Sequence, residues 1–175
     1  MRIVGGKWAR KHIFLPKALP VRPTMDMARE SLFNILNHRF SIANKDILDL
    51  FSGSGIVSLE FASHNAKTID MVENNFRVIQ HLNKLADHFD FQHKIIQKDV
   101  FQFLKNTSKK YDIVFADPPY NHTRIRELPD LIFKNQILSK SGILILEHPQ
   151  SIEIEHTYKF DTRKFGQSMF SFFQA

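Results

Sequence analysis

Short apolar segments alternate with segments of helical periodicity along most of this 175-residue chain, and this alternation limits the folds that it can adopt. The apolar segments favour β-structure and cover residues 45–51, 68–73, 94–99, 112–116 and 142–147. Apolar residues spaced by three and four positions lie between them and predict helices. Strands that alternate with helices predict an α/β fold with a doubly wound, mostly parallel sheet.

The helices are predicted from apolar stripes, and two of the stripes follow a capping residue, Thr24 or Asn74-Asn75. They cover residues 24–37, 56–63, 76–86 and 126–136. Thr24 is the expected N-cap of the first helix, and the second is expected to be amphipathic. Phe76 begins a stripe that is expected in the core, and His148 is interpreted as a loop residue.

The two ends of the chain have patterns of their own. Residues 1–23 contain several glycines and prolines and are interpreted as a basic N-terminal arm or small hairpin. Residues 24–175 are expected to form a single domain. Near the C-terminus, residues 159–165 and 168–173 flank a Gly-Gln turn and predict an antiparallel hairpin that closes the sheet.

The fourth predicted strand ends in Asp117-Pro118-Pro119-Tyr120. Proline cannot donate to a strand ladder and holds its own φ near about −65°, so the motif ends the strand in a rigid bracket. The Asp117 carboxylate and the Pro118 carbonyl are both acceptors, which suits the exocyclic amine of a nucleobase. Tyr120 is then placed to stack on the base. The alternative is a strand-ending turn with a surface tyrosine.

Glycines and acids follow the first three strands. Gly53-x-Gly55 lets the backbone approach a ligand beside the free N–H groups of a helix start. The third glycine of the dinucleotide pattern is absent, which disfavours a dehydrogenase and fits the methionine end of S-adenosylmethionine. A tight turn without a ligand is the alternative.

Two acids are candidates for holding a nucleoside. Glu73 ends the second strand and is placed to accept hydrogen bonds from both ribose hydroxyls. Asp99 ends the third strand and is placed to accept from an adenine amine, with Val100 or Phe101 against the ring; a role as a helix N-cap is the alternative. Since the carboxyl ends of parallel strands share one edge, we expect these groups to meet at one ligand site.

The net charge of +6 comes entirely from the N-terminal arm. Residues 1–22 carry six basic side chains and no acid, while the rest of the chain has 18 of each sign. A basic segment with interleaved Trp8 and Phe14 is typical of a surface that follows nucleic-acid phosphates. A solvated tail is the alternative.

The composition also excludes several classes of protein. The chain has no cysteine, which excludes disulfides and thiolate metal sites, and we expect no bound metal. No window is apolar enough for a membrane span, and the first residues do not resemble a signal peptide. We therefore expect a cytoplasmic protein, and we expect it to be a monomer.

Five sequence blocks together resemble the bacterial RsmD-type methyltransferases. The blocks cover residues 2–8, 22–26, 29–36, 49–55 and 117–120, and the resemblance spans nearly the whole chain. Asp-Pro-Pro-Tyr is similar to the motif of amino methyltransferases that act on adenine, cytosine or guanine, and the N-terminal blocks separate this group from DNA adenine methyltransferases. The resemblance implies a Rossmann-like class I methyltransferase that uses S-adenosyl-L-methionine.

The resemblance also implies a substrate and a set of site residues. The substrate is the N2 amine of one guanine in 16S ribosomal RNA, within the small subunit or an assembly intermediate. The cofactor residues are Asp49, Phe51, Gly53, Ser54, Gly55, Glu73, Asn74, Asp99 and Val100. The catalytic residues are Asp117, Pro118, Pro119 and Tyr120. The RNA-contacting residues are Arg2, Lys7, Arg10, Lys11 and Arg22.

The chain departs from the family pattern at Met27, His64-Asn65 and Phe165. The first two departures remove positive charge and bear on RNA contact, and none bears on the proposed chemistry. Two other functions stay open at this point. One is a DNA amino methyltransferase, and the other is an RNA-binding ribosome assembly factor with a vestigial cofactor site.

Overall fold

The computed structural model describes residues 1–16, 19–21 and 26–174. The short 3-10 helix η1 covers Gly6–Trp8. The α-helices are α1 (Asp26–Arg39), α2 (Ile56–Ser63), α3 (Phe76–Phe89), α4 (Val100–Asn106) and α5 (Glu127–Lys134). The strands are β1 (Asp46–Leu50), β2 (Thr68–Glu73), β3 (His93–Gln97), β4 (Tyr111–Ala116), β5 (Leu138–Pro149), β6 (Lys159–Phe165) and β7 (Ser168–Phe173).

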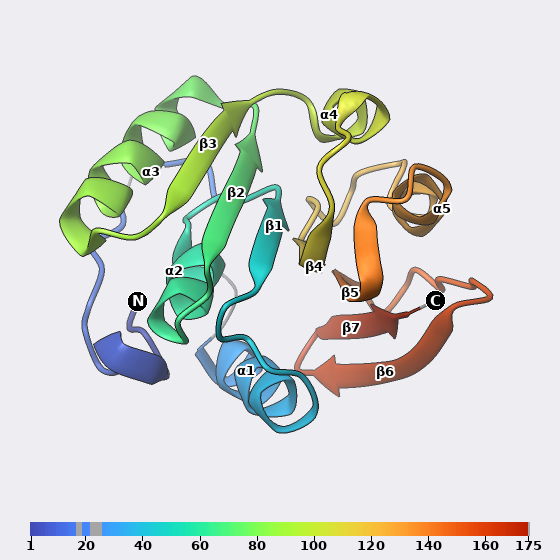
Figure 1. Cartoon of the computed structure of the whole chain (residues 1–175), viewed down its shortest axis with the longest axis horizontal. Helices are drawn as coiled ribbons and strands as arrows, with labels where there is room; N and C mark the ends of the chain where they lie inside the picture. Colours follow the sequence, from blue (N-terminus) through green and yellow to red (C-terminus); the bar gives the residue numbers. More distant parts are fainter. Residues whose placement is uncertain (17–18, 22–25, 175) are drawn as a thin grey trace.

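In the described residues, seven strands form one sheet in the order β3-β2-β1-β4-β5-β7-β6 (Figure 1). The first five strands in this order, from β3 to β5, are parallel to one another. The strand β7 is antiparallel to both β5 and β6. The predicted doubly wound sheet with a closing antiparallel hairpin is therefore confirmed. The carboxyl ends of β1, β2 and β3 point to the top of Figure 1.

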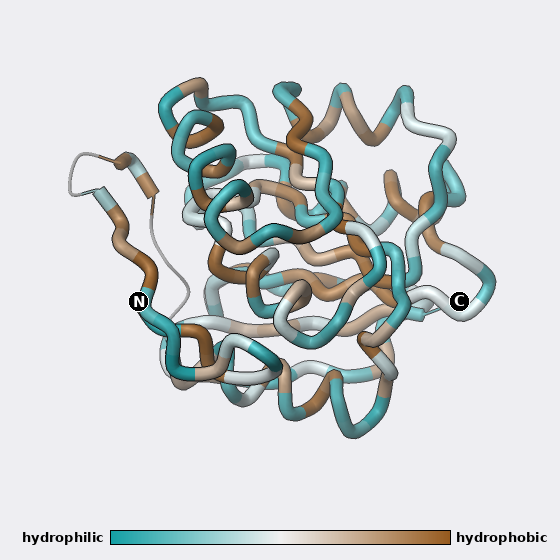
Figure 2. The backbone as a smooth tube through the Cα atoms, turned by 60° about the vertical axis from the view of Figure 1, so that its left-hand side comes forward, coloured by the Kyte–Doolittle hydropathy of each residue, from teal (hydrophilic) through white to brown (hydrophobic). Residues whose placement is uncertain are grey.

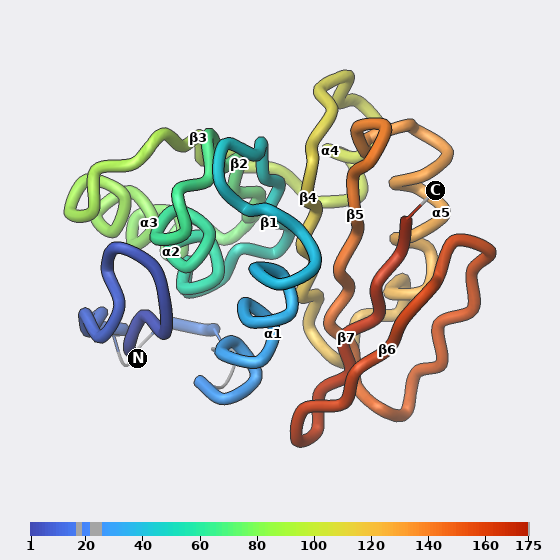
Figure 3. Tube along the Cα trace, turned by 60° about the horizontal axis from the view of Figure 1, so that its bottom comes forward, coloured from blue at the N-terminus to red at the C-terminus, as the bar shows by residue number. Residues whose placement is uncertain are grey.

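Each central strand is buried on both faces because alternate side chains enter two different cores. In β4, Ile113 and Phe115 pack with residues of α1, α2 and α3, whereas Val114 and Ala116 pack with residues of α4 and α5. The same alternation holds for β5. Figure 3 shows α1, α2 and α3 on one side of the sheet and α4 and α5 on the other.

The apolar residues lie inside, and polar residues cover the outer turns of the helices (Figure 2). The helix α2 differs from its predicted amphipathic character, because all of its residues are buried. It lies between the sheet and the N-terminal segment, so neither of its faces meets solvent. Within residues 1–16, 19–21 and 26–174, no helix combines the length and apolar character needed to cross a bilayer.

The first thirteen residues form a small hairpin-like segment that packs on the domain. Arg2 and His12 form an isolated antiparallel bridge, and Ile3 and Ile13 are buried in the core. The Trp8 ring lies 5.0 Å from the Phe89 ring at the C-terminal end of α3. Figure 1 shows this segment at the lower left, away from the carboxyl ends of β1, β2 and β3.

A buried ion pair fixes this segment to α1 and α2. Arg29 and Glu60 are both fully buried, and Nε of Arg29 donates to Oε1 of Glu60 at 3.3 Å. The Glu60 carboxylate also accepts from the backbone N–H groups of Val4 and Gly5, and Arg29 Nη2 donates to the Arg2 carbonyl. The pair therefore satisfies backbone groups of the N-terminal segment that burial removes from water.

Two interpretations of single residues are wrong. Phe76 is 60% exposed, because it occupies the first position of α3 and extends beyond the sheet; the buried stripe contains Val78, Ile79, Leu82, Ala86 and Phe89 instead. His148 is not in a loop but in β5, where it is buried and its Nε2 lies 2.9 Å from Ser171 Oγ. The predicted N-cap Thr24 lies outside the described residues.

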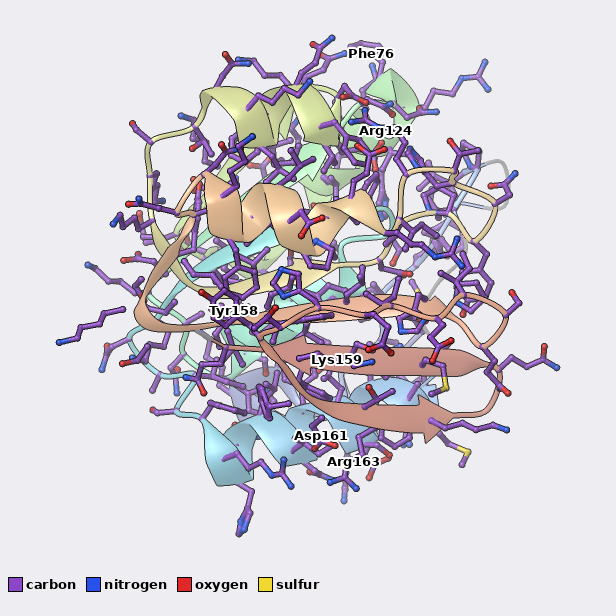
Figure 4. The ribbon with its side chains drawn as sticks, turned by 90° about the vertical axis from the view of Figure 1, so that its right-hand side faces the viewer. Phe76, Arg124, Tyr158, Lys159, Asp161 and Arg163 are labelled. Atoms are coloured by element: carbon purple, nitrogen blue, oxygen red, sulfur yellow. The ribbon has the colours of Figure 1, made fainter. Side chains whose placement is uncertain are left out.

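The C-terminal hairpin contacts α1 through surface charges. Arg39 Nη1 donates to Asp161 at 2.8 Å, and Arg163 pairs with the same carboxylate. Figure 4 shows Asp161 and Arg163 beside α1. Because these groups are partly exposed, we expect the pair to contribute at most about 1 kcal/mol.

We expect Arg29→Met to destabilise the protein by roughly 3–5 kcal/mol, because it leaves the buried Glu60 carboxylate without its cation. Residues 1–13 should also exchange their amide hydrogens faster, since their anchor is lost. Urea unfolding and hydrogen exchange measure the two effects. Arg39→Met is the matched control and should cost at most about 1 kcal/mol. Equal effects of the two substitutions would contradict the proposed anchoring role.

Candidate functional site

A cavity of about 570 Å³ lies at the carboxyl edge of the sheet. Its volume is in the range of about 300–1,000 Å³ that is typical of small-molecule sites. Its walls include these residues predicted for the cofactor and the base: Asp49, Phe51, Gly53, Ser54, Glu73, Asn74, Asp99, Val100, Asp117, Pro118, Pro119 and Tyr120. The loops after β1, β2, β3 and β4 thus contribute to one cavity, as their parallel arrangement requires.

Gly55 is placed differently from the other predicted cofactor residues. It does not line the cavity but precedes α2 with a φ of 75°, a conformation that favours glycine. A Cβ atom at this position would lie 2.6 Å from Leu82 Cδ2 and 2.8 Å from Leu85 Cδ2. Gly55 therefore allows the start of α2 to pack closely on α3.

The predicted RNA-contacting residues lie away from the cavity. Arg2 pairs with Asp26 at 3.5 Å, and Lys7 lies over the Trp8 ring. Lys11 lies 5.9 Å from the centre of the Phe89 ring. Arg10 is exposed on the same segment, and Arg22 lies outside the described residues. The structure therefore places Lys7 and Lys11 near the C-terminal end of α3 and Arg2 at the start of α1, and none of these residues lines the cavity.

Glu73 connects the two loops that form one end of the cavity. Its Oε2 accepts from the Gly53 N–H at 3.2 Å, and its Oε1 accepts from the N–H groups of Asn74 and Asn75 at 2.8 and 2.9 Å. The carboxylate therefore holds the loop after β1 against the loop after β2. His81 also contacts the loop after β1, since its Nε2 lies 3.2 Å from the Ser54 carbonyl.

Asp49 is the buried acid at the floor of the cavity. Only 1% of it is exposed, and Ser58 Oγ donates to its Oδ2. Burial raises the pKa of Asp49 to about 7, the nearby Glu73 charge adds to this rise, and the Ser58 hydrogen bond opposes it. Asp49 is thus poised to change its charge near neutral pH.

Asp99 is a helix cap and also part of the cavity wall. Its Oδ1 accepts from the Gln102 N–H at 3.0 Å, which makes it the N-cap of α4. The residue also lines the cavity, with Val100 beside it. The helix cap orients the carboxylate, and the cavity wall includes it.

The bracket after β4 forms the opposite end of the cavity. Asp117, Pro118, Pro119 and Tyr120 all line it. The Tyr120 hydroxyl is hydrogen bonded to Ser168 Oγ and lies 3.4 Å from Glu147 Oε1. The hydroxyl is therefore anchored by β5 and β7, so Tyr120 is not the surface tyrosine of the alternative interpretation.

The segment after Tyr120 folds back against α4. The His122 N–H donates to the Pro119 carbonyl at 2.8 Å, and the His122 ring stacks on Phe101 with centroids 5.1 Å apart. The Arg124 guanidinium lies 3.9 Å from the centre of the same Phe101 ring. Figure 4 shows Arg124 at the same edge of the molecule as the exposed Phe76.

Several wall residues were not predicted from the sequence. They include Pro20, Val21, Lys98, His122, Glu147 and Ser168. Pro20 and Val21 belong to the segment before α1, and Ser168 belongs to the C-terminal hairpin. Pro20, Val21 and Ser168 are distant in sequence from the other site residues, whereas Lys98 and His122 lie within two residues of Asp99 and Tyr120 but outside the predicted motifs. Glu147 ends the predicted fifth strand and follows the same strand-end rule as Glu73.

The comparisons with known proteins agree with this geometry. The family model described as conserved hypothetical protein 95 matches residues 1–174. Ribosomal RNA small subunit methyltransferase D of Escherichia coli K12 is 32% identical over 148 residues, which are 84% of this chain and 74% of the relative. The chain belongs to the RsmD-type methyltransferase family. The expectation drawn from the five sequence blocks is thereby confirmed.

Solved structures of the same fold cover most or all of the chain. A hypothetical protein of Thermus thermophilus superposes with a TM-score of 0.87 at 23% identity and covers 100% of this chain and 99% of its own. The T. thermophilus 16S rRNA N2 G1207 methyltransferase RsmC, solved with AdoMet and guanosine, has a TM-score of 0.66 at 20% identity. The matched region is 89% of this chain and 45% of the RsmC chain. These two likenesses show the shared Rossmann-like fold.

We expect Asp49→Asn to change how stability depends on pH. The raised pKa means that the stability contributed by this group is present below its unfolded pKa of about 4 and is lost as the pH rises to about 7. An amide cannot ionise, so the variant should gain roughly 2 kcal/mol relative to the wild type between pH 5 and pH 8. Urea unfolding of both proteins at the two pH values measures this difference.

The control for this measurement is Asp87→Asn, which changes an exposed carboxylate on α3. Its stability relative to the wild type should change little with pH. A constant difference between Asp49→Asn and the wild type at both pH values would refute the assigned protonation of Asp49.

Proposed function

We propose that this protein transfers a methyl group from S-adenosyl-L-methionine to the N2 amine of a guanine in 16S ribosomal RNA. The observation that carries the proposal is that one cavity is lined both by the Asp117-Pro118-Pro119-Tyr120 bracket and by the glycine loop and acids after β1, β2 and β3. Membership of the RsmD-type family supports it, as does the relative named ribosomal RNA small subunit methyltransferase D.

The chemistry of the cavity wall fits the cofactor. Glu73 would accept from the ribose hydroxyls, and Asp99 would accept from the adenine amine with Val100 against the ring. Asp49 and the Gly53–Ser54 turn would hold the methionine end, where an ionised Asp49 suits a cationic amino group. When bound, S-adenosylmethionine supplies an electrophilic methyl group on a sulfonium sulfur. No residue of the chain needs to carry the methyl group in this reaction.

The bracket would hold the base that receives the methyl group. The Asp117 carboxylate and the Pro118 carbonyl would accept from the two hydrogens of N2, and the Tyr120 ring would stack on the base. These hydrogen bonds direct the nitrogen lone pair at the methyl carbon and stabilise the charge that develops on nitrogen. One N–H proton leaves as the N–C bond forms, and Asp117 either takes this proton or orients the amine while water takes it.

The basic N-terminal segment suggests how a large substrate would be held. Arg2, Lys7, Arg10 and Lys11 lie away from the cavity, so they would contact phosphates of RNA remote from the target base. A folded particle can present a base to the cavity and, at the same time, distant phosphates to the N-terminal segment. A short free RNA does this less readily. We therefore propose the small subunit or an assembly intermediate as the substrate, and a monomer as the active form.

The experiment that tests the function incubates the protein with labelled S-adenosylmethionine and each of three substrates. They are unmethylated small ribosomal subunits, total RNA and duplex DNA. Nucleoside digestion and chromatography should give N2-methylguanosine from the subunits. Labelled N6-methyladenosine or N4-methylcytosine in DNA would favour a DNA methyltransferase instead. Binding to subunits without cofactor binding in calorimetry would favour an assembly factor.

We expect Asp117→Ala to lower the rate of methyl transfer by about a thousandfold, because it removes an acceptor that acts on the reacting nitrogen. The dissociation constant of S-adenosylmethionine should change by less than about threefold, since Asp117 lies at the other end of the cavity. Single-turnover kinetics and calorimetry measure the two quantities. Asp130→Ala, an exposed carboxylate on α5, is the control that should keep both values. Unchanged turnover of Asp117→Ala would refute the assignment.

A further inference from the structure

Glu147 is a buried acid in the cavity wall that the proposed reaction does not use. It is only 3% exposed, and it belongs to β5. In the parallel register of β4 and β5, Ala116 pairs with Leu146, so Asp117 and Glu147 are the next residues on neighbouring strands. Neighbouring strands lie about 4.8 Å apart, so the backbone of Glu147 runs beside the point where Asp117 leaves β4, and both residues line the cavity.

The C-terminal hairpin holds this second carboxylate in a defined position. Ser168 Oγ donates to Glu147 Oε1 at 2.7 Å, and the Tyr120 hydroxyl lies 3.4 Å from the same oxygen. The side chain on which a base would stack and the Glu147 carboxylate are therefore fixed by one hydrogen-bond cluster. A group held in this way can discriminate between bases because it does not move to suit a different partner.

Guanine differs from adenine and cytosine, the other bases with an exocyclic amine, in the hydrogen-bond donors of its base-pairing edge. In guanine, the N1–H donor is next to the N2 amine, so the edge carries donors at both atoms. Adenine and cytosine instead have an acceptor nitrogen next to their amine. If Asp117 and the Pro118 carbonyl accept from N2, the adjacent N1–H needs one more acceptor when the base is buried. A carboxylate is an acceptor only, so it suits guanine and repels the lone pair of an acceptor nitrogen.

We propose that Glu147 accepts a hydrogen bond from N1–H of the target guanine and thereby selects guanine over bases with an acceptor at this position. The inference rests on the proposed function, since it assigns the base specificity of the same cavity. It makes Glu147 a specificity residue, while Asp117 and Pro118 hold the amine that reacts.

The test uses 2-aminopurine, which keeps the 2-amino group of guanine but has an acceptor in place of N1–H. Small subunits are reconstituted on RNA with either guanine or 2-aminopurine at the mapped target position. The wild type should methylate guanine about 10- to 100-fold faster, because the second base leaves Glu147 facing a lone pair. Equal rates on the two bases would overturn the inference, and this arm needs no variant.

The second arm uses Glu147→Gln, whose amide can donate to the acceptor of 2-aminopurine. The variant should lose at least about tenfold on guanine, and its preference for guanine over 2-aminopurine should fall to about one. Equal losses of rate on guanine and 2-aminopurine would overturn the inference. They would mean that Glu147 only positions Tyr120. Tyr120→Phe removes the hydroxyl of that cluster, but Ser168 still donates to Glu147, so the variant should keep its preference for guanine over 2-aminopurine. Glu153→Gln, an exposed carboxylate, should keep both rates.

The failure of this inference can be told apart from failure of the proposed function. A wild type that transfers no methyl group to the guanine-containing subunits would refute the function itself. A wild type that methylates guanine N2 but does not distinguish 2-aminopurine would refute only the role of Glu147. The dissociation constant of S-adenosylmethionine for Glu147→Gln should match that of the wild type, which confirms that the variant is folded.

Discussion

The parallel pairing of β1, β2 and β4 determines where the functional groups of this protein can lie. In a parallel sheet every carboxyl end reaches the same edge, so the loop after each strand enters one cavity. Asp49, Glu73 and Asp117 are far apart in sequence, yet the register of the strands brings all three to that cavity. The helices that cover both faces bury the strands and leave this edge open to a ligand.

Buried charge has two different functions in the molecule. The Arg29–Glu60 pair is satisfied within the protein, and it ties the N-terminal segment to α1 and α2 through backbone groups of that segment. Asp49 has a hydroxyl partner rather than a cation, and burial raises its pKa to about 7. Both carboxylates lose hydration on burial, and among the residues that the structure describes a cation compensates only Glu60. Asp49 is therefore the one whose charge a cationic ligand would stabilise.

The cavity has two ends that are built by different parts of the chain. The end near Glu73 is formed by loops that follow β1, β2 and β3, and the Glu73 carboxylate accepts from backbone N–H groups of the first two loops. The end near Tyr120 is completed by the C-terminal hairpin through Ser168, and by Glu147 of β5. The hairpin thus closes the sheet and also fixes the orientation of the tyrosine that follows the two prolines.

The sequence by itself determined the local features of the fold and one edge of the site. Strand and helix periodicity predicted the order of the elements, and strand-end motifs placed Glu73, Asp99 and the Asp117–Tyr120 bracket correctly at one cavity, because these features depend on neighbours in the chain. Only the tertiary structure decided that Glu147 and Ser168 anchor Tyr120 and that Arg29 pairs with Glu60. It also decided that the basic segment lies away from the cavity. The physical reason is that such partners are chosen by packing between segments distant in sequence, and residue spacing carries no record of that packing.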